Sequence, residues 1–310
     1  MTKVSFICPV YNKRHYLPNV LKSIKEQTGN YRKEYLFIDD GSTDNSLNYI
    51  REHTKEWKNC KIFSQSNKGP ASATQKGIEH STGDYIKLVG GDDIMSPNCT
   101  EILLESIIKT SSIAAFSKYS LYKKFSEIKF KNEKIKNLSI IKDPLTKTIQ
   151  SNYSGTTPNL YSKDAIEKSG GCYKNLFIED FSLVLRISKF GTFCFIDNLT
   201  SYGPKEDKNR IMLGSKNQLL HDFNAAIYYF LIENKNLNKK IKKIACIKCL
   251  GRAEKWYRRE LSGTVFSKIN FKRLRYYLFS GNEEQLIKSS CQVFYQKQKK
   301  NIRQIRYKLI

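Results

Sequence analysis

The chain has 310 residues, 40% hydrophobic and 12% aromatic, which excludes a disordered protein and allows one large domain or two moderate ones. No run of 18 apolar residues occurs, which excludes a membrane-spanning helix. The net charge of +25 is uneven: residues 205–310 hold 25 Lys and Arg against 8 Asp and Glu, or +17, and the rest of the chain contributes +8. This basic C-terminal third predicts an anionic partner, such as nucleic acid, phospholipid headgroups or a phosphate-bearing substrate.

The start of the chain and its cysteines indicate the compartment. MTKVSFICPVYNKRHYL enters a strand pattern without a signal segment, which predicts a cytoplasmic protein. Eight scattered cysteines, mostly among apolar neighbours, are typical of small buried hydrophobes in a reducing compartment. CIKC at 246–249 lacks a second pair and a nearby histidine, so packing is favoured over a zinc or redox site.

The first hundred residues alternate strand and helix patterns. Apolar strand-like runs are KVSFICPVY, EYLFIDD, CKIFSQ and DYIKLVG, and helical spacing occurs in LPNVLKSIKEQT, STDNSLNYIREHT and GPASATQKGIEHS. Ser42 resembles the N-cap of the second helix. This order predicts βαβ units and a parallel sheet covered on both faces. Ligands bind beyond the carboxyl ends of such strands, so VYN, DDGSTD and GGDD should share one crevice.

The second hundred residues predict a mixture of elements. A helix is expected near TEILLESIIKTS, a strand near IAAFSKYSLYK, and then a lysine-rich loop. SGTTPNLYSKDAIEKSGG has the pattern of loop, strand, helix and turn, and IEDFSLVLRISKFG that of an amphipathic helix. From about residue 205 onward the pattern is helical and basic.

The adjacent carboxylates of Asp92 and Asp93 follow an apolar strand and two glycines. They fit either a hydrated acidic turn or a site for a divalent cation shared with an anionic ligand. Other nucleotide chemistries lack their signatures, because the turn after the first strand, CPVYNKRHY, has no glycine for a dinucleotide fingerprint and the chain has no P-loop.

Four collinear segments resemble the family 2 glycosyltransferases of the GT-A fold, in order over residues 3–195. They are VSFICPVYNKRHYLPNVLKSIKEQT, FIDDGSTDNS, NKGPASATQKGIEHSTGDYIKLVGGDD and IEDFSLVLRISKFG. The resemblance implies a GT-A catalytic domain over residues 1–204, an α/β domain with a Rossmann-like, mostly parallel sheet flanked by helices. Its nucleotide-binding half would be about 1–99 and its acceptor and sugar half about 100–204. A mainly helical, basic region is expected over 205–310.

The resemblance implies a nucleotide site at Pro9, Tyr11, Asp40 and Asp92. Tyr11 would stack on uracil, and Asp40 would accept the uracil N3–H and select uridine. A core tyrosine and an Asx turn with a helix cap are the structural alternatives for these two segments. The family motif is D-x-D, and Gly91 occupies its first position here. The implied Mn²⁺ or Mg²⁺ therefore falls on Asp93, with Asp92 supporting it or contacting the sugar–ribose side.

The resemblance also implies a general base and a sugar pocket. Asp180 matches the base, with Glu179 as its rival, although a carboxylate at a helix start is also favoured by the helix dipole. A single base with departure of a diphosphate implies inversion at the anomeric carbon. The pocket between the segments SGTTPN and GGCYKN would contact sugar and acceptor. The candidate contact residues are Thr157 and Asn159, together with Glu179. Thr74 stands where the family usually has an arginine near the diphosphate, and Lys68 and Lys76 are candidate replacements.

The predicted function is an inverting, metal-dependent glycosyltransferase. It would move a sugar from a UDP-sugar to a saccharide or lipid-linked acceptor in bacterial-type surface polysaccharide synthesis. The alternative is a basic nucleic-acid-binding protein without enzymatic activity, suggested by KWYRRELSG, FKRLRYYLF and KQKKNIRQIRYK. That alternative leaves DDGSTD, GGDD and IEDF unexplained, so we expect no nucleic-acid partner.

The end of the chain, residues 252–310, predicts a peripheral contact with the inner face of the cell membrane. Trp256, Tyr257, Phe271, Leu274, Tyr277 and Leu278 lie among six Lys and Arg residues. Apolar stripes flanked by cations are typical of an interfacial helix on anionic lipid. The alternative is that the aromatic side chains pack onto the sheet domain and the cations are solvated.

Overall fold

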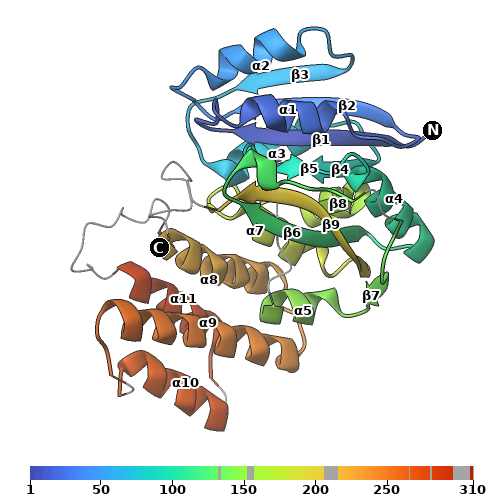
Figure 1. Cartoon of the computed structure of the whole chain (residues 1–310). Coiled ribbons are helices and arrows are strands. Elements are labelled where there is room, and N and C mark those ends of the chain that lie inside the picture. The colour runs from blue at the N-terminus through green and yellow to red at the C-terminus, as the bar shows by residue number, and fades with distance from the viewer. Residues whose placement is uncertain are drawn as a thin grey trace.

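The computed structural model describes residues 1–131, 134–151, 157–205, 216–264, 266–279, 281–295 and 308–309. Within these residues, nine strands form one sheet in the order β3-β2-β1-β4-β8-β6-β9-β5, and β7 pairs with β9 (Figure 1). The strands are β1 (Lys3–Val10), β2 (Arg32–Asp39), β3 (Cys60–Ser64), β4 (Tyr85–Leu88), β5 (Ile94–Met95), β6 (Ala114–Tyr122), β7 (Ser139–Ile141), β8 (Asn159–Ser162) and β9 (Phe193–Pro204).

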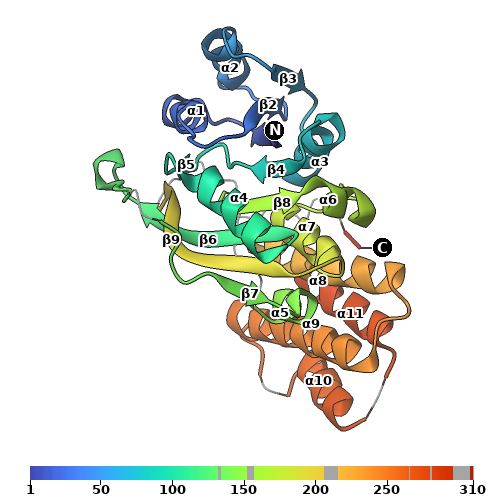
Figure 2. The same ribbon diagram turned by 90° about the vertical axis from the view of Figure 1, so that its right-hand side faces the viewer.

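Helices cover both faces of the sheet, as the βαβ pattern predicts. The helices of the first two hundred residues are α1 (Leu17–Lys25), α2 (Ser46–Thr54), α3 (Pro70–His80), α4 (Cys99–Thr110), α5 (Pro144–Ser151), α6 (Lys163–Ser169) and α7 (Glu179–Ile187). Phe6 and Cys8 of β1 join the core with α1 and α4, whereas Ile7 joins the core with α3 and α7. Figure 2 shows α1 and α3 on opposite faces of the first strands. The apolar run of β1 is therefore buried on both sides.

The sheet is parallel in its first half and mixed in its second. Strands β3, β2, β1 and β4 are parallel, as predicted, and β6 is parallel to β9. The other four pairs, β4–β8, β8–β6, β9–β5 and β9–β7, are antiparallel. The α/β fold class is confirmed, and the antiparallel pairs bring the segment at Thr157 and Asn159 beside the end of β4.

The C-terminal region is helical, as predicted. Its helices are α8 (Lys216–Glu233), α9 (Lys239–Glu260), α10 (Lys268–Leu278) and α11 (Glu283–Gln292). They share one hydrophobic core with α5 and α7, and Trp256 lies fully buried in it. Cys246 and Cys249 of the CIKC segment are also buried there. The predicted boundary at 204 and 205 thus lies between β9 and α8, but it does not separate two cores.

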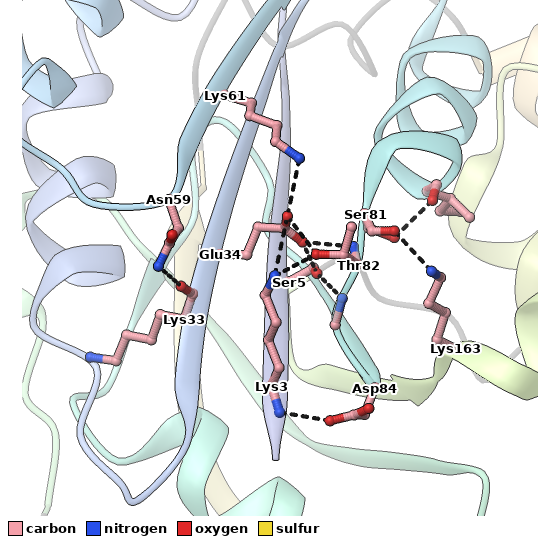
Figure 3. A network of polar contacts seen from close by, with 12 residues as sticks. Lys3, Ser5, Lys33, Glu34, Asn59, Lys61, Ser81, Thr82, Asp84 and Lys163 are labelled. Atoms are coloured by element: carbon pink, nitrogen blue, oxygen red, sulfur yellow. Dashed lines mark hydrogen bonds and ion pairs between the residues drawn. The ribbon is translucent and has the colours of Figure 1, made fainter. Parts of the chain in front are cut away.

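A closed polar network lies at the amino ends of β1 and β2 (Figure 3). The Glu34 carboxylate accepts hydrogen bonds from Ser5 Oγ at 2.5 Å and from Thr82 N and Oγ1 at 2.8 and 2.9 Å. Lys3 and Lys61 lie 3.5 and 3.4 Å away. Burial alone would raise the pKa of Glu34, but these hydrogen bonds and the charge of Lys3 lower it to about 2. The network joins three strands to the turn before β4.

Candidate active site

The acidic turn after β4 is folded tightly against the end of β1. A Cβ on Gly91 would lie 3.1 Å from the Pro9 carbonyl oxygen, and one on Gly90 would lie 2.7 Å from Asp93 Oδ2. The two glycines therefore let the Asp93 carboxylate fold back over the turn while the turn packs on β1. This close packing gives a physical reason why a glycine occupies the first position of the D-x-D motif.

Lys13 is the cation of this turn, and sequence reasoning missed it. It follows β1, its side chain is 7% exposed, and its Nζ lies 2.6 Å from Asp92 Oδ2. Its backbone N–H donates to Ser46 Oγ at 2.9 Å, which ties it to the start of α2. Below the turn, burial raises the pKa of the Cys8 thiol, and the charges of Asp92 and Asp93 add to the effect. The buried Cys8 thiol, Lys13 and the two carboxylates thus meet at the ends of β1 and β4.

Asp93 is buried and oriented by groups from the antiparallel half of the sheet. Thr157 Oγ1 donates to Asp93 Oδ2 at 2.5 Å, and the Tyr119 hydroxyl donates to Oδ1 at 3.2 Å. Lys87, fully buried in β4, donates to the carbonyl oxygens of Thr157 and, at 2.8 Å, of Asn159. Burial lowers the pKa of Lys87.

Thr157 and Asn159, predicted as sugar or acceptor contacts, are fully buried here. Thr157 Oγ1 faces Asp93, and Asn159 Oδ1 accepts a hydrogen bond from the Leu88 backbone at 3.3 Å. Both side chains therefore hold the end of β4 in place, and direct contact with a sugar stays a prediction.

The DDGSTD segment follows β2 and lies beside the VYN segment. Asp40 is buried and accepts hydrogen bonds from Gln65 Nε2 at 2.9 Å and from the backbone of Lys68 and Gly69 at 2.8 Å. Three of the roughly four acceptor positions of a carboxylate are thus in use. Tyr11 is half-buried directly after β1.

The predicted N-cap role of Ser42 is wrong. Helix α2 begins at Ser46, and Ser42 Oγ instead accepts a hydrogen bond from the Asn12 backbone at 3.0 Å. Asp39, its neighbour along the segment, is buried and accepts from the Ser42 backbone at 3.3 Å and from Ser64 Oγ at 3.2 Å. Ser42 and Asp39 therefore tie the segment to the turn after β1 and to β3, and its last residue, Asp44, accepts a hydrogen bond from the Ser46 backbone at 3.1 Å at the start of α2.

Asp180 and Glu179 are the first two residues of α7 and are partly buried. Asp180 Oδ1 accepts a hydrogen bond from the Phe181 backbone at 2.7 Å. A positive helix end stabilises carboxylates at this position. The charges of both residues reach Cys172, where burial is the main cause of a raised thiol pKa. The structure thus places the predicted base at a helix start, with its side chain only partly buried.

A buried acid in the C-terminal region holds the segment that precedes Asp180. Asp222 of α8 is fully buried, and its Oδ2 accepts a hydrogen bond from the Phe177 backbone at 2.5 Å. Its Oδ1 lies 2.6 Å from His221 Nδ1, and His221 Nε2 lies 3.1 Å from the Tyr295 hydroxyl. Burial raises the pKa of Asp222, opposed by His221 and the hydrogen bonds. Sequence analysis could not find this link, because no local motif surrounds Asp222.

Thr74 occupies the place of the family arginine, and Lys76 and Lys13 point in different directions. Thr74 is buried in α3. Lys76 Nζ donates to the Ser64 carbonyl at 3.2 Å and lies over the Phe63 ring, toward β3. Lys13 is the lysine whose Nζ contacts the acidic turn, at Asp92.

The residues at the turn fit a divalent cation held jointly with a ligand. Among the described residues no group of three or more His, Cys, Asp and Glu could hold a metal by itself. Mg²⁺ and Mn²⁺ at phosphate sites take one or two carboxylates and complete their coordination with substrate phosphates and water. Asp93, oriented by Thr157 and Tyr119, and Asp92 would supply that donor set.

Comparison with known proteins assigns the family. Residues 5–170, more than half of the chain, match the family described as glycosyl transferase family 2, so the chain belongs to this family. It is 28% identical over 210 residues to a cholesterol galactosyltransferase of Borreliella burgdorferi, covering 63% of this chain and 58% of that protein. It spans 16 to 48% of the length of other curated relatives that it matches.

Solved structures share the fold. The Staphylococcus aureus TarS fragment 1–349 in complex with UDP-GlcNAc has a TM-score of 0.65 at 18% identity, with 95% of this chain and 81% of that chain covered. The mannosyltransferase PcManGT of Pyrobaculum calidifontis, in complex with GDP-Man and Mn²⁺, has a TM-score of 0.54 at 11% identity, with 94% and 85% covered. At these identities the likeness establishes the GT-A fold of the sheet domain, and the matches also cover most of the helical C-terminal region.

Proposed function

We propose that the protein is an inverting, metal-dependent glycosyltransferase that uses a UDP-sugar. The observation that carries the proposal is the Asp92–Asp93 turn with Lys13 at the carboxyl ends of β1 and β4, in a chain of glycosyl transferase family 2. Such an edge is where ligands of parallel sheets bind. The neighbours bound to UDP-GlcNAc or to GDP-Man with Mn²⁺ support a nucleotide-sugar donor and a cation.

Each residue has a defined part in this proposal. Tyr11 stacks on the base, and Asp40 offers its remaining acceptor position to the uracil N3–H. Asp93, with Asp92, holds Mn²⁺ or Mg²⁺, which when bound supplies positive charge to the diphosphate leaving group. Lys13 takes the part of the arginine that Thr74 replaces and contacts a phosphate oxygen. Its bond to Asp92 keeps the ammonium at the turn when no donor is bound.

Asp180 is the proposed general base. It accepts the proton of the acceptor hydroxyl as that oxygen attacks the anomeric carbon, and the bond from this carbon to the diphosphate breaks on the opposite side. One displacement of this kind inverts the configuration. Asp222 keeps the segment before α7 in place, so that the base does not shift away from the attacking oxygen.

The proposed acceptor is a saccharide or a lipid-linked saccharide of bacterial-type surface polysaccharide synthesis. The name of one relative, cholesterol galactosyltransferase, indicates transfer to a lipid, which supports a lipid-linked acceptor. Residues 1–204 form the proposed catalytic domain, and exposed side chains of the basic helical region, within residues 252–310, are proposed to contact the inner face of the cell membrane from the cytoplasmic side. No helix among the described residues is long and apolar enough to cross a membrane.

The test is donor hydrolysis with a panel of nucleotide sugars. We expect one or a few UDP-sugars to release UDP with Mn²⁺ present, no release with chelator, and no release by Asp93→Ala. Retention of RNA at physiological salt is measured in parallel. Release that is insensitive to chelator would contradict the metal role, and RNA retention without any donor turnover would favour the nucleic-acid-binding alternative.

A further inference from the structure

Exposed apolar side chains gather on and beside α10. Of thirteen large hydrophobic residues exposed within the described part of the chain, six fall between residues 266 and 279. They are Phe266, Phe271, Leu274, Tyr277, Leu278 and Phe279, and their exposed fractions run from 48 to 93%. Single exposed hydrophobics are ordinary, whereas a contiguous set marks an interaction site.

Helical spacing sorts the residues of α10 into three sectors. Phe271, Leu274 and Leu278 are spaced i, i+3 and i+7, so they form one exposed stripe, here called the apolar stripe. Lys268, Lys272 and Arg275 are spaced i, i+4 and i+7, so they form a second stripe beside it, the cationic stripe. Both stripes face solvent along the length of the helix.

The third sector fixes the helix to the rest of the protein. Ile269 and Tyr276 are buried in the core shared with α9, and the Tyr276 hydroxyl donates to Glu283 at 2.7 Å. Arg273 turns toward this side and lies 3.7 Å from Glu254. The inward face is therefore occupied, and the apolar and cationic stripes are what remains for an external partner.

The charge of this surface has one sign. Residues 261–282 contain four Lys and Arg residues and no Asp or Glu. No ion pair within the described residues engages the side chains of the cationic stripe, whereas Arg273 has its partner in Glu254. Three cations beside a row of leucine and phenylalanine match the composition of helices that lie in the headgroup region of anionic bilayers.

We propose that the apolar and cationic stripes of α10 dock the protein on an anionic phospholipid bilayer. Phe271, Leu274 and Leu278 enter the boundary between headgroups and acyl chains, and the cations contact the lipid phosphates. A second copy of the chain fits less well, because a two-fold contact would bring two identical cationic faces together. Figures 1 and 2 place α10 at the end of the molecule opposite α2 and β3, so docking leaves the ends of β1 and β4 uncovered.

The exposed surface is smaller than the one predicted for residues 252–310. Trp256 is fully buried and donates to Asn217 Oδ1 at 2.7 Å, so it belongs to the core and not to a lipid surface. The surface is confined to α10 and its flanks. Its use in reaching a lipid-linked acceptor rests on the proposed function, but binding to the bilayer does not, so the two can fail separately.

The test is co-sedimentation of the full chain with vesicles, either of phosphatidylcholine alone or with about a third phosphatidylserine. We expect binding to the anionic vesicles at low salt and its loss at high salt. Lys268→Gln, Lys272→Gln and Arg275→Gln together should weaken binding on the order of a hundredfold, at roughly fivefold per cation. The matched control removes three exposed lysines at the opposite end, by Lys25→Gln, Lys55→Gln and Lys58→Gln, and should bind like the wild type.

A second variant tests the apolar stripe. Phe271→Gln, Leu274→Gln and Leu278→Gln keep the charge and suit a helix, and they should also abolish sedimentation. The melting temperature and UDP binding of each variant confirm that it is folded. Wild-type protein that remains in the supernatant at low salt, or a dimer that depends on Leu274 and Leu278, would overturn the proposal. An equal loss of vesicle binding in the control variant would show that binding depends on net charge alone, and would contradict docking through α10.

Discussion

The two ends of the parallel strands carry buried carboxylates in opposite situations. At the amino ends, Glu34 is enclosed by Ser5, Thr82 and two lysines. At the carboxyl ends, Asp92 and Asp93 are adjacent. Lys13 pairs with Asp92, and Asp93 accepts hydrogen bonds from Thr157 and Tyr119. Like charges repel, so two adjacent carboxylates favour a positive ion beside them. The single carboxylate at the amino ends is enclosed by donors and lysines and stabilises the fold, whereas the adjacent pair at the carboxyl ends is the proposed cation site.

Asp40 shows that the end of a strand at which a carboxylate lies does not by itself decide whether that carboxylate stabilises the fold or binds a ligand. It lies at the carboxyl end of β2 but accepts three hydrogen bonds, from Gln65 and from the backbone before α3. It therefore connects β2 to α3, and its contact with a base stays a prediction. The substitutions below test whether this distinction between the two ends is real.

The largest effect is expected for Asp180→Asn. The amide has the same shape and cannot accept the proton, so turnover should fall by about two to four orders of magnitude while the Kd for UDP stays near that of the wild type. Single-turnover kinetics with UDP binding by calorimetry separates the two quantities. Parallel loss of UDP affinity would assign a structural role to Asp180 instead.

The next effect concerns Asp222→Asn, which removes a charge far from the donor. If the Phe177 backbone is released, the base shifts and kcat should fall by up to about a hundredfold. The Kd for UDP should change less than about twofold. A merely unfolded fraction would lower kcat and the number of UDP sites by the same factor, which calorimetry detects.

Lys13→Gln tests the proposed replacement of the arginine. A charge-assisted hydrogen bond is worth about 1.5–3 kcal/mol, so the affinity for UDP should fall by roughly ten- to a hundredfold. The affinity for uridine, which has no phosphate, should not change. Lys76→Gln is the matched control and should leave both affinities unaltered, because Lys76 points toward β3. Equal weakening of uridine and UDP would contradict a phosphate contact.

The smallest effect on catalysis is expected at the amino end, for Glu34→Gln. Its pKa of about 2, below the ordinary 4.5, means that the ionised form stabilises the fold above pH 4.5 and that this stabilisation is lost as pH falls toward 2. Unfolding in urea should show a loss of roughly 1–3 kcal/mol at pH 7 and a smaller one near pH 3. The activity of the folded fraction should be unchanged. A pH-independent loss would contradict the lowered pKa.

The sequence predicted those parts of the molecule that local patterns determine. The βαβ order, the carboxyl-end position of Asp92 and Asp93 and the helix that carries Asp180 in its first turn all follow from runs of neighbouring residues. Strand β9 was missed, because its polar residues are satisfied far away along the chain. Asn198, for example, is buried and binds the backbone of Lys134 and Lys136. The Lys13–Asp92 and Asp222–Phe177 contacts also join distant segments, and no local pattern reveals such pairs.

The most direct test of the contrast between the two ends is the thermal shift produced by UDP, with and without Mn²⁺, in three proteins. The account predicts that UDP stabilises the wild type only with the cation present. It also predicts that Asp93→Ala removes this cation-dependent part and that Glu34→Gln, though less stable itself, keeps the full shift. A UDP shift that persists in chelator, or that survives Asp93→Ala unchanged, would contradict the assignment of the cation site to the Asp92–Asp93 turn.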